Sequence, residues 1–206
     1  MKDTAFYKFV VLVNGAVPLA LLCWDAYRHH LGVNPVSFAL RTTGMLTLVF
    51  LLLSLTVTPA RKVSGWNFLS HFRRTLGLYA FFYGLLHLST YFVFDRSMSF
   101  SGMVSDVAAR PFILVGMTAF VLMVPLAATS TNGMIKRLGA ARWKKLHRLV
   151  YLSAIAGVVH YYMLVKADVR QPVAFAIVLG ALLLYRVLDS RFAFLRRGRT
   201  PARPAT

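Results

Sequence analysis

Long apolar stretches alternate with short polar connections along almost the whole chain, and this alternation predicts a helical membrane protein. A run of about 20 apolar residues is long enough to cross a hydrocarbon core about 30 Å thick. Each such run is expected to be a helix, because a backbone in contact with lipid has to satisfy its own hydrogen bonds. The predicted fold is all-α, a six-helix transmembrane bundle, with spans at roughly Phe6–Trp24, Leu40–Val57, Leu76–Phe94, Phe112–Ala128, Leu149–Val165 and Val173–Leu188.

Composition agrees with this pattern and leaves little room for a second kind of domain. Of the 206 residues, 58% are hydrophobic, which is well above the share in soluble domains. We expect one membrane domain over residues 1–190 and a basic, disordered cytoplasmic tail over residues 191–206. The first span follows Lys2 as a signal peptide would, but no small-residue cleavage site follows it, so we expect it to be retained.

The net charge of +18 is unevenly distributed between the connections. Those after the second and fourth spans, and the tail, carry Lys and Arg without any acid, whereas the other three carry both signs. Basic residues collect on the cytoplasmic side of membrane proteins, so the sequence predicts that both the N- and the C-terminus are cytoplasmic. Because topology accounts for the charge, nucleic acid is not expected as a partner.

Three histidines lie within or at the edge of the predicted spans, where an ionisable side chain is expensive and marks a functional site. Spans three and five both run outward, so depth can be compared by counting. His87 lies 13 residues beyond Arg74, and His160 lies 13 residues beyond His147. At about 1.5 Å per residue, His87 and His160 therefore reach the same depth, in the outer half of the membrane. Two imidazoles at matched height on facing helices are what a six-coordinate haem b requires, so His87 and His160 are the expected axial ligands.

His147, at the cytoplasmic edge of the fifth span, is a further candidate metal ligand. The residue at the same depth on the third span is Arg73 or Arg74 rather than a histidine. A second haem would therefore need an unusual sixth ligand, an open coordination site, or a movement of His71 into the site. Thirteen residues of ideal helix rotate by about 220°, so His147 and His160 share a face only if the helix is distorted. A headgroup-facing role for His147 stays open, and Arg74 can contact a haem propionate, a flavin phosphate or membrane lipid.

Several stretches of the chain resemble the MsrQ (YedZ) family. That family comprises haem-binding membrane subunits of the MsrPQ methionine sulfoxide reductase system, within the superfamily of ferric reductase-like transmembrane domains. The likeness covers about residues 40–190 in matching order and spacing. It rests on Arg73–Phe81 followed by Tyr83 and Leu86-His87-Leu88, and on Leu126–Asn132, Trp143–Tyr151 and His160-Tyr161-Tyr162.

The resemblance implies a ferric reductase-like transmembrane haem domain over residues 1–190, with haem b between the third and fifth helices, and FMN. It implies that electrons enter from the quinone pool or a cytosolic flavin reductase and leave to MsrP, a periplasmic molybdenum-containing reductase that repairs oxidised proteins. The chain would then be an electron-transfer subunit of the bacterial inner membrane rather than the catalytic subunit. Oxidase-type relatives carry two histidines on each of these helices, and Arg73 or Arg74 departs from that pattern here.

Two other interpretations stay open. One is a stand-alone transmembrane haem reductase that reduces metal chelates or oxygen without a partner. The other is a non-redox membrane transporter or assembly factor whose histidines are structural or relay protons. The outer connections contain acids that are either docking contacts for a soluble partner or plain exposed loop charges: Asp25, Asp95, Asp106 and Asp168.

Overall fold

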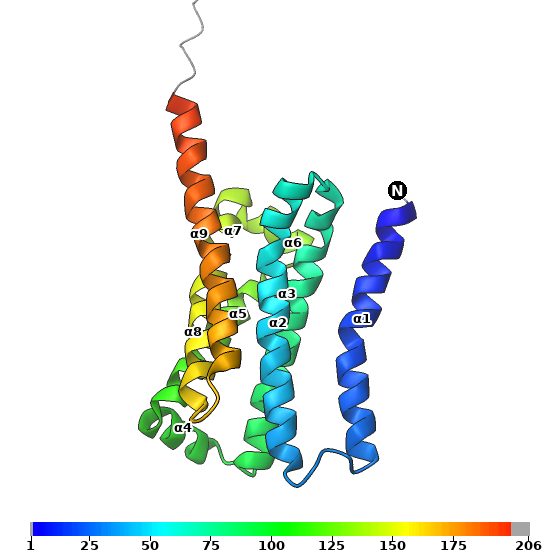
Figure 1. Ribbon diagram of the computed structural model, residues 1–206, viewed down its shortest axis with the longest axis vertical. Coiled ribbons are helices and arrows are strands. Elements are labelled where there is room, and N and C mark those ends of the chain that lie inside the picture. Colours follow the sequence, from blue (N-terminus) through cyan, green and yellow to red (C-terminus); the bar gives the residue numbers. More distant parts are fainter. Residues whose placement is uncertain (1, 199–206) are drawn as a thin grey trace, which may run out of the picture.

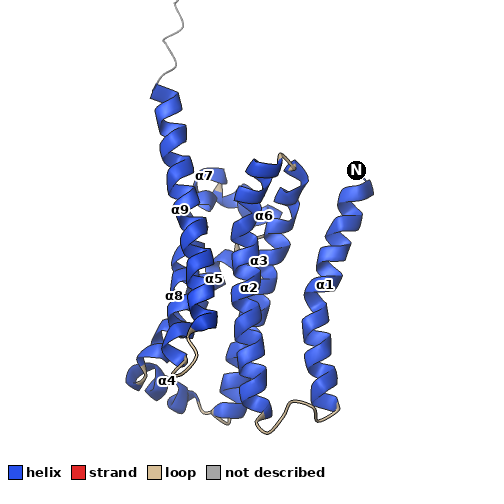
Figure 2. Cartoon of the chain, viewed as in Figure 1, coloured by secondary structure: helices blue, strands red, loops and turns tan. Residues whose placement is uncertain are grey.

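The computed structural model describes residues 2–198, and the expected tail beyond residue 198 lies outside the described residues. The described chain consists of helices joined by short loops and contains no strand, which confirms the all-α prediction (Figure 2). A short 3₁₀ helix, η1 (Asn67–His71), precedes α3, and a π-helical turn, η2 (Tyr91–Asp95), follows it. The α-helices are α1 (Lys2–Tyr27), α2 (Pro35–Ser64), α3 (Phe72–Thr90), α4 (Phe100–Ala109), α5 (Pro111–Ala128), α6 (Asn132–Leu138), α7 (Ala140–Leu146), α8 (Leu149–Leu164) and α9 (Arg170–Gly198).

Five stretches of the described chain are long and apolar enough to cross a membrane: Ala5–Tyr27, Pro35–Ser64, Asn67–Asp95, Pro111–Ala128 and Arg170–Arg191. The fifth predicted span corresponds to α8, which has only 16 residues and is not among these five stretches. Large apolar side chains are exposed along the outer faces of these helices, for example Leu53, Val121 and Ile177. Such faces suit helices that are solvated by lipid rather than by water.

The long helices pack as two pairs, with α9 against both pairs and α1 at the side. α2 packs most extensively against α3, and α5 packs most extensively against α8; α3 contacts α5, and α9 contacts both α2 and α8. α1 stands at the edge of the bundle (Figure 1), where the hydroxyls of Tyr79 and Tyr83 on α3 donate to its backbone carbonyls at Leu12 and Gly15. The first and last described helices place their free ends at the same end of the bundle, together with α6 and α7 (Figure 1).

Local sequence signals explain where α2 begins and ends. Pro35 occupies the first turn, and the side chain of Asn34 accepts a hydrogen bond from the Ser37 backbone N–H at 2.9 Å. At the other end Gly65 adopts φ 75°, and its N–H donates to the Arg61 carbonyl. A residue with a Cβ is strained at that φ, so glycine suits this C-terminal stop.

Three short helices occupy stretches that were expected to be connections. α4 lies in the third connection, where the Ser99 hydroxyl caps it by accepting from the Gly102 N–H at 3.1 Å. α6 and α7 lie in the fourth connection and have seven residues each. α3 begins at Phe72 rather than at Leu76, so Arg73 and Arg74 are part of it. α9 continues to Gly198, past residue 191, at which the tail was expected to start.

Candidate functional site

The imidazoles of His87 on α3 and His160 on α8 face each other inside the bundle. Their ring centroids are 6.2 Å apart, and the ring planes are inclined by 81°. Both side chains are part-buried. The structure thus brings together the two histidines that counting placed at one depth, while their role as ligands stays a prediction.

Each of these imidazoles is oriented by a backbone carbonyl of a neighbouring helix. Nδ1 of His87 lies 2.9 Å from the carbonyl oxygen of Leu40 on α2, and Nδ1 of His160 lies 2.6 Å from that of Phe112 on α5. A carbonyl only accepts, so Nδ1 carries the proton in both rings and Nε2 keeps its lone pair. Metal-binding histidines are held in this way, with the ring nitrogen that is not a ligand donating to a carbonyl.

The spacing of the pair fits two axial ligands of one iron. A metal–imidazole bond is about 2 Å long, and the ring centroid lies about 1 Å behind the ligating nitrogen, so two rings on one metal have centroids about 6 Å apart. Within the described residues no three His, Cys, Asp or Glu side chains gather as a metal site. A bare metal ion would lack ligands there, whereas haem iron takes four from the porphyrin and needs two from the protein.

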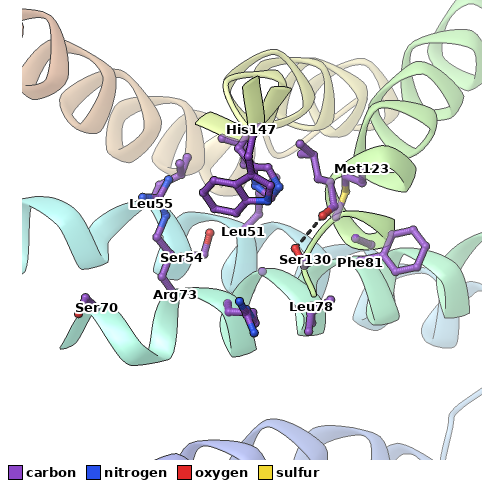
Figure 3. Close-up of a pocket in the computed structure, with 16 residues that line it drawn as sticks. Leu51, Ser54, Leu55, Ser70, Arg73, Leu78, Phe81, Met123, Ser130 and His147 are labelled. Atoms are coloured by element: carbon purple, nitrogen blue, oxygen red, sulfur yellow. Dashed lines mark hydrogen bonds between the residues drawn. The ribbon is translucent and has the colours of Figure 1, made fainter. Parts of the chain in front are cut away.

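A cavity of about 250 Å³, called the inner cavity below, lies closer than the histidine pair to the end of the bundle that carries α6 and α7. Its walls come from α3 on one side and from the α7–α8 turn on another, with α2 and α5 completing them (Figure 3). The described lining includes Arg73, Arg74, Trp143 and His147 and contains no acid. The cavity is therefore electropositive, and guanidinium groups of this kind bind carboxylate or phosphate groups.

His147 lies in the turn that interrupts the chain between α7 and α8. α8 begins only at Leu149, so His147 and His160 do not belong to one continuous helix. The His147 ring stacks on Trp143 with centroids 3.9 Å apart, and Nε2 lies 3.2 Å from the Thr129 hydroxyl. Burial, and then the positive charge of Arg73, lower the pKa of His147, which keeps the imidazole neutral at neutral pH.

Arg74 lines the cavity and also ties two helices together, because its guanidinium donates to the side-chain oxygen of Asn132 on α6 at 2.8 Å. His71 is exposed, with Nδ1 3.0 Å from the Phe68 carbonyl, and it is not part of the described cavity wall. The sequence analysis considered Arg73, Arg74 and His71 as the groups opposite His147. The structure brings the two arginines to the cavity and leaves His71 outside it.

One of the four outer acids is not a surface group. Asp106 is buried, accepts a hydrogen bond from the Tyr91 hydroxyl at 2.5 Å, and pairs with Arg96 and with Arg110, the latter at 3.3 Å. The expectation that Asp106 is a docking contact or an exposed loop charge is wrong, because its oxygens are already used within the protein. Asp168 is exposed and pairs with Arg170 at 3.0 Å.

Residues 42–158 match the model of the family described as ferric reductase like transmembrane component. This stretch is more than half of the chain and contains α3, α5 and the inner cavity, so the chain belongs to that family.

Relatives that align with nearly the whole chain show to which group within this family it belongs. Three of them bear the name protein-methionine-sulfoxide reductase heme-binding subunit MsrQ. The protein of Herminiimonas arsenicoxydans is 44% identical over 97% of this chain and 91% of its own length. Those of Caulobacter vibrioides and Ralstonia nicotianae are 46% and 50% identical, over 93% and 90% of this chain and 90% and 87% of their own lengths. The chain is a member of the MsrQ group and a multi-pass bacterial membrane protein.

Proposed function

We propose that this chain is a membrane b-type cytochrome that delivers electrons to the periplasmic methionine sulfoxide reductase MsrP. Its relatives are named as haem-binding subunits of protein-methionine-sulfoxide reductase. The observation that carries the proposal is the pair His87 and His160, with ring centroids 6.2 Å apart and both Nδ1 atoms on backbone carbonyls. When bound, haem b supplies one-electron redox chemistry at its iron.

The residues of the chain prepare the ligand pair. The carbonyls of Leu40 and Phe112 keep the proton on Nδ1, so each Nε2 has a lone pair to offer without a change of tautomer. A hydrogen bond from Nδ1–H also raises the basicity of the ligating nitrogen. Both rings are part-buried between the helices, and limiting the access of water to such a site favours electron transfer over side reactions.

The proposed topology has six crossings, by α1, α2, α3, α5, α8 and α9, with both termini in the cytoplasm. α8 packs beside α5 and α9, and its 16 residues rise about 24 Å, which is most of the hydrocarbon thickness of about 30 Å. The acid-free, Lys- and Arg-rich connections lie at the end of the bundle that carries η1, α6 and α7. The positive-inside rule puts that end in the cytoplasm and the histidine pair toward the periplasm.

The inner cavity is the proposed place of electron entry and of FMN, with the quinone pool or a cytosolic flavin reductase as donor. Its electropositive lining supports this, since Arg73, Arg74 and neutral His147 can contact a phosphate or propionate. Trp143, already stacked on His147, adds an aromatic surface. His147 also stays the candidate for an additional metal ligand, and Arg74 for a contact with lipid.

The first experiment tests the ligand pair by absorption spectroscopy. Purified wild-type protein should be red, with a Soret band that shifts on reduction. His87→Ala and His160→Ala should each abolish or convert that same signal, because either change removes one of two axial ligands. His71→Ala, at an exposed ring outside the cavity, is the matched control and should leave the spectrum unchanged.

The outcomes separate the competing functions. Colourless wild-type protein would favour a non-redox transporter. Loss of signal in only one of the two variants would show that the pairing is wrong. Turnover of a metal chelate or of oxygen by the purified chain, at rates unaffected by MsrP, would favour a stand-alone reductase.

A second experiment tests the inner cavity by counting flavin per chain. Arg74→Ala should weaken FMN binding about tenfold or more, and so lower the FMN content, because a charge-assisted hydrogen bond to phosphate is worth about 1.5–3 kcal/mol. Asn132→Ala is the matched control: it removes the same 2.8 Å bond to Arg74 but keeps the positive charge. Equal loss in both variants would indicate that the contact between α3 and α6, rather than the charge, holds the flavin.

A further inference from the structure

Each imidazole of the histidine pair lies directly against a glycine of the neighbouring helix. A Cβ atom built on Gly44 of α2 would lie 3.1 Å from Cε1 and Nδ1 of His87. A Cβ atom built on Gly116 of α5 would lie 2.7 Å from the same two atoms of His160. Ordinary van der Waals contact begins at about 3.4 Å, so beside an alanine the His160 ring would have to move away, and the His87 ring would have to give by a few tenths of an ångström.

The two contacts share one construction. Leu40, whose carbonyl accepts from His87, lies four residues before Gly44, and Phe112, whose carbonyl accepts from His160, lies four residues before Gly116. Residues four apart lie on one face of a helix, about one turn from each other. The carbonyl and its histidine are 47 residues apart in the first case and 48 in the second.

We propose that Gly44 with the Leu40 carbonyl, and Gly116 with the Phe112 carbonyl, form two equivalent seats that fix the planes of the axial imidazoles. The hydrogen bond sets the rotation of each ring about its Cβ–Cγ bond, and the bare glycine backbone lets the ring lie flat against the helix. Together the seats hold the two rings at 81° to each other. These glycines are positioning residues, and the inference rests on the proposed haem ligation by His87 and His160.

Other glycines near the pair serve the packing of helices instead. Gly84 and Gly157 each precede a histidine of the pair by three residues on its own helix. A Cβ at Gly84 would meet the Phe120 ring at 3.4 Å, and one at Gly157 would meet Leu48 at 2.9 Å. Among the described glycines, only Gly44 and Gly116 have an imidazole as the nearest neighbour of an added Cβ.

The seats make a graded prediction about the haem spectrum. In Gly116→Ala the methyl group drives the His160 ring off its carbonyl and off the ligand axis, so haem affinity should fall about tenfold or more, as for other losses of ligand orientation. The haem that stays bound should show high-spin ferric character. In Gly44→Ala the overlap is smaller, so haem should be retained with a shifted low-spin electron paramagnetic resonance signal. Gly180→Ala, where a Cβ meets nothing within 4 Å, is the control and should match the wild type.

A double variant keeps the test decisive if Gly116→Ala fails to fold. The clash is with the imidazole, so Gly116→Ala should leave the thermal stability of His160→Ala protein unchanged in detergent, while lowering that of the wild type. If the alanine destabilises both backgrounds equally, Gly116 serves the packing of α5 and the inference is overturned. Wild-type haem content and spectra in both glycine variants would overturn it as well.

The proposed function fails by a different result, namely wild-type protein without haem, or haem that His160→Ala leaves intact. The stability comparison between the two backgrounds does not require haem. A failure of the seats and a failure of the ligand assignment are therefore distinguishable.

Discussion

Asp106 shows how a single side chain can hold an outer connection of the bundle in place. Its carboxylate accepts from the Tyr91 hydroxyl in η2 and pairs with Arg96 and Arg110 on either side of α4. A buried carboxylate is unfavourable unless partners of this kind compensate for the lost water. One acid therefore joins the end of α3 to the start of α5 through the helix between them.

Replacing this carboxylate should destabilise the protein. Asp106→Ala leaves two guanidinium groups and a phenol without their shared acceptor, and we expect a loss of about 2 kcal/mol, less than for a fully buried pair because both arginines are partly exposed. Thermal unfolding in detergent measures it. Asp168→Ala is the control, since that acid and Arg170 are both exposed, and it should change stability by less than about 0.5 kcal/mol. Equal effects of the two variants would contradict a structural role for Asp106.

At the scale of the helices, Pro59 of α2 and Arg186 of α9 form a complementary pair. Proline has no N–H, so Pro59 leaves the carbonyl of Leu55, four residues earlier, without its helical donor. Arg186 supplies the missing donor at 3.0 Å, and also donates to the Tyr151 hydroxyl at 2.6 Å. Freed carbonyls within membrane helices are tolerated when a neighbouring helix re-satisfies them, as α9 does here.

This pairing predicts a coupling between the two positions. Arg186→Gln should cost more stability in the presence of Pro59 than in a Pro59→Ala background, where the helix satisfies the Leu55 carbonyl itself. A coupling energy of about 1 kcal/mol is expected from the value of one hydrogen bond. Thermal unfolding of the wild type, both single variants and the double variant gives this energy. Additivity of the two changes within about 0.5 kcal/mol would show that Arg186 does not serve the proline site.

The elements that hydropathy could predict are the long ones. The apolar runs predicted the long helices of the bundle. Counting residues along two parallel helices placed His87 and His160 at the same depth, because every α-helix rises by the same distance per residue. α4, α6 and α7 were missed because helices of seven to ten residues in polar connections have no long apolar run. The turn at His147 was missed too, since no glycine or proline marks it.

The partners of the site were harder to predict than its histidines. Leu40 and Phe112 contribute only carbonyl oxygens, which every residue has, and they lie 47 and 48 residues from the rings that they orient. Their glycines carried a signal: each lies four residues after its acceptor in a span, at a nearly constant distance before a histidine. A search for a repeated glycine–histidine interval would have found both, whereas the contact of Arg186 with Leu55 becomes visible only once α2 and α9 are packed.

At the scale of the whole molecule, the site depends on two helix pairs of the same design. α2 with α3, and α5 with α8, each bring one histidine against one glycine and one carbonyl of the partner helix. The rings meet where the two pairs face each other. The inner cavity lies between the same helices, nearer α6 and α7. One arrangement of helices thus creates two sites at different depths, as the proposed electron transfer across the membrane requires.

The direction of that transfer depends on which end of the bundle faces the cytoplasm, and the single cysteine of the chain allows a direct test. In a Cys23→Ala background, one new cysteine is introduced at Val33 or Ala167, at the α4 end, or at Val63 or Arg137, at the α6–α7 end; all four positions are exposed. A membrane-impermeant maleimide applied to intact spheroplasts should label Val33→Cys and Ala167→Cys. It should label Val63→Cys and Arg137→Cys only after lysis, because the proposed topology places the basic end in the cytoplasm. The reverse pattern would invert the orientation, and equal labelling of Arg137→Cys and Ala167→Cys before lysis would show that α8 does not cross the membrane.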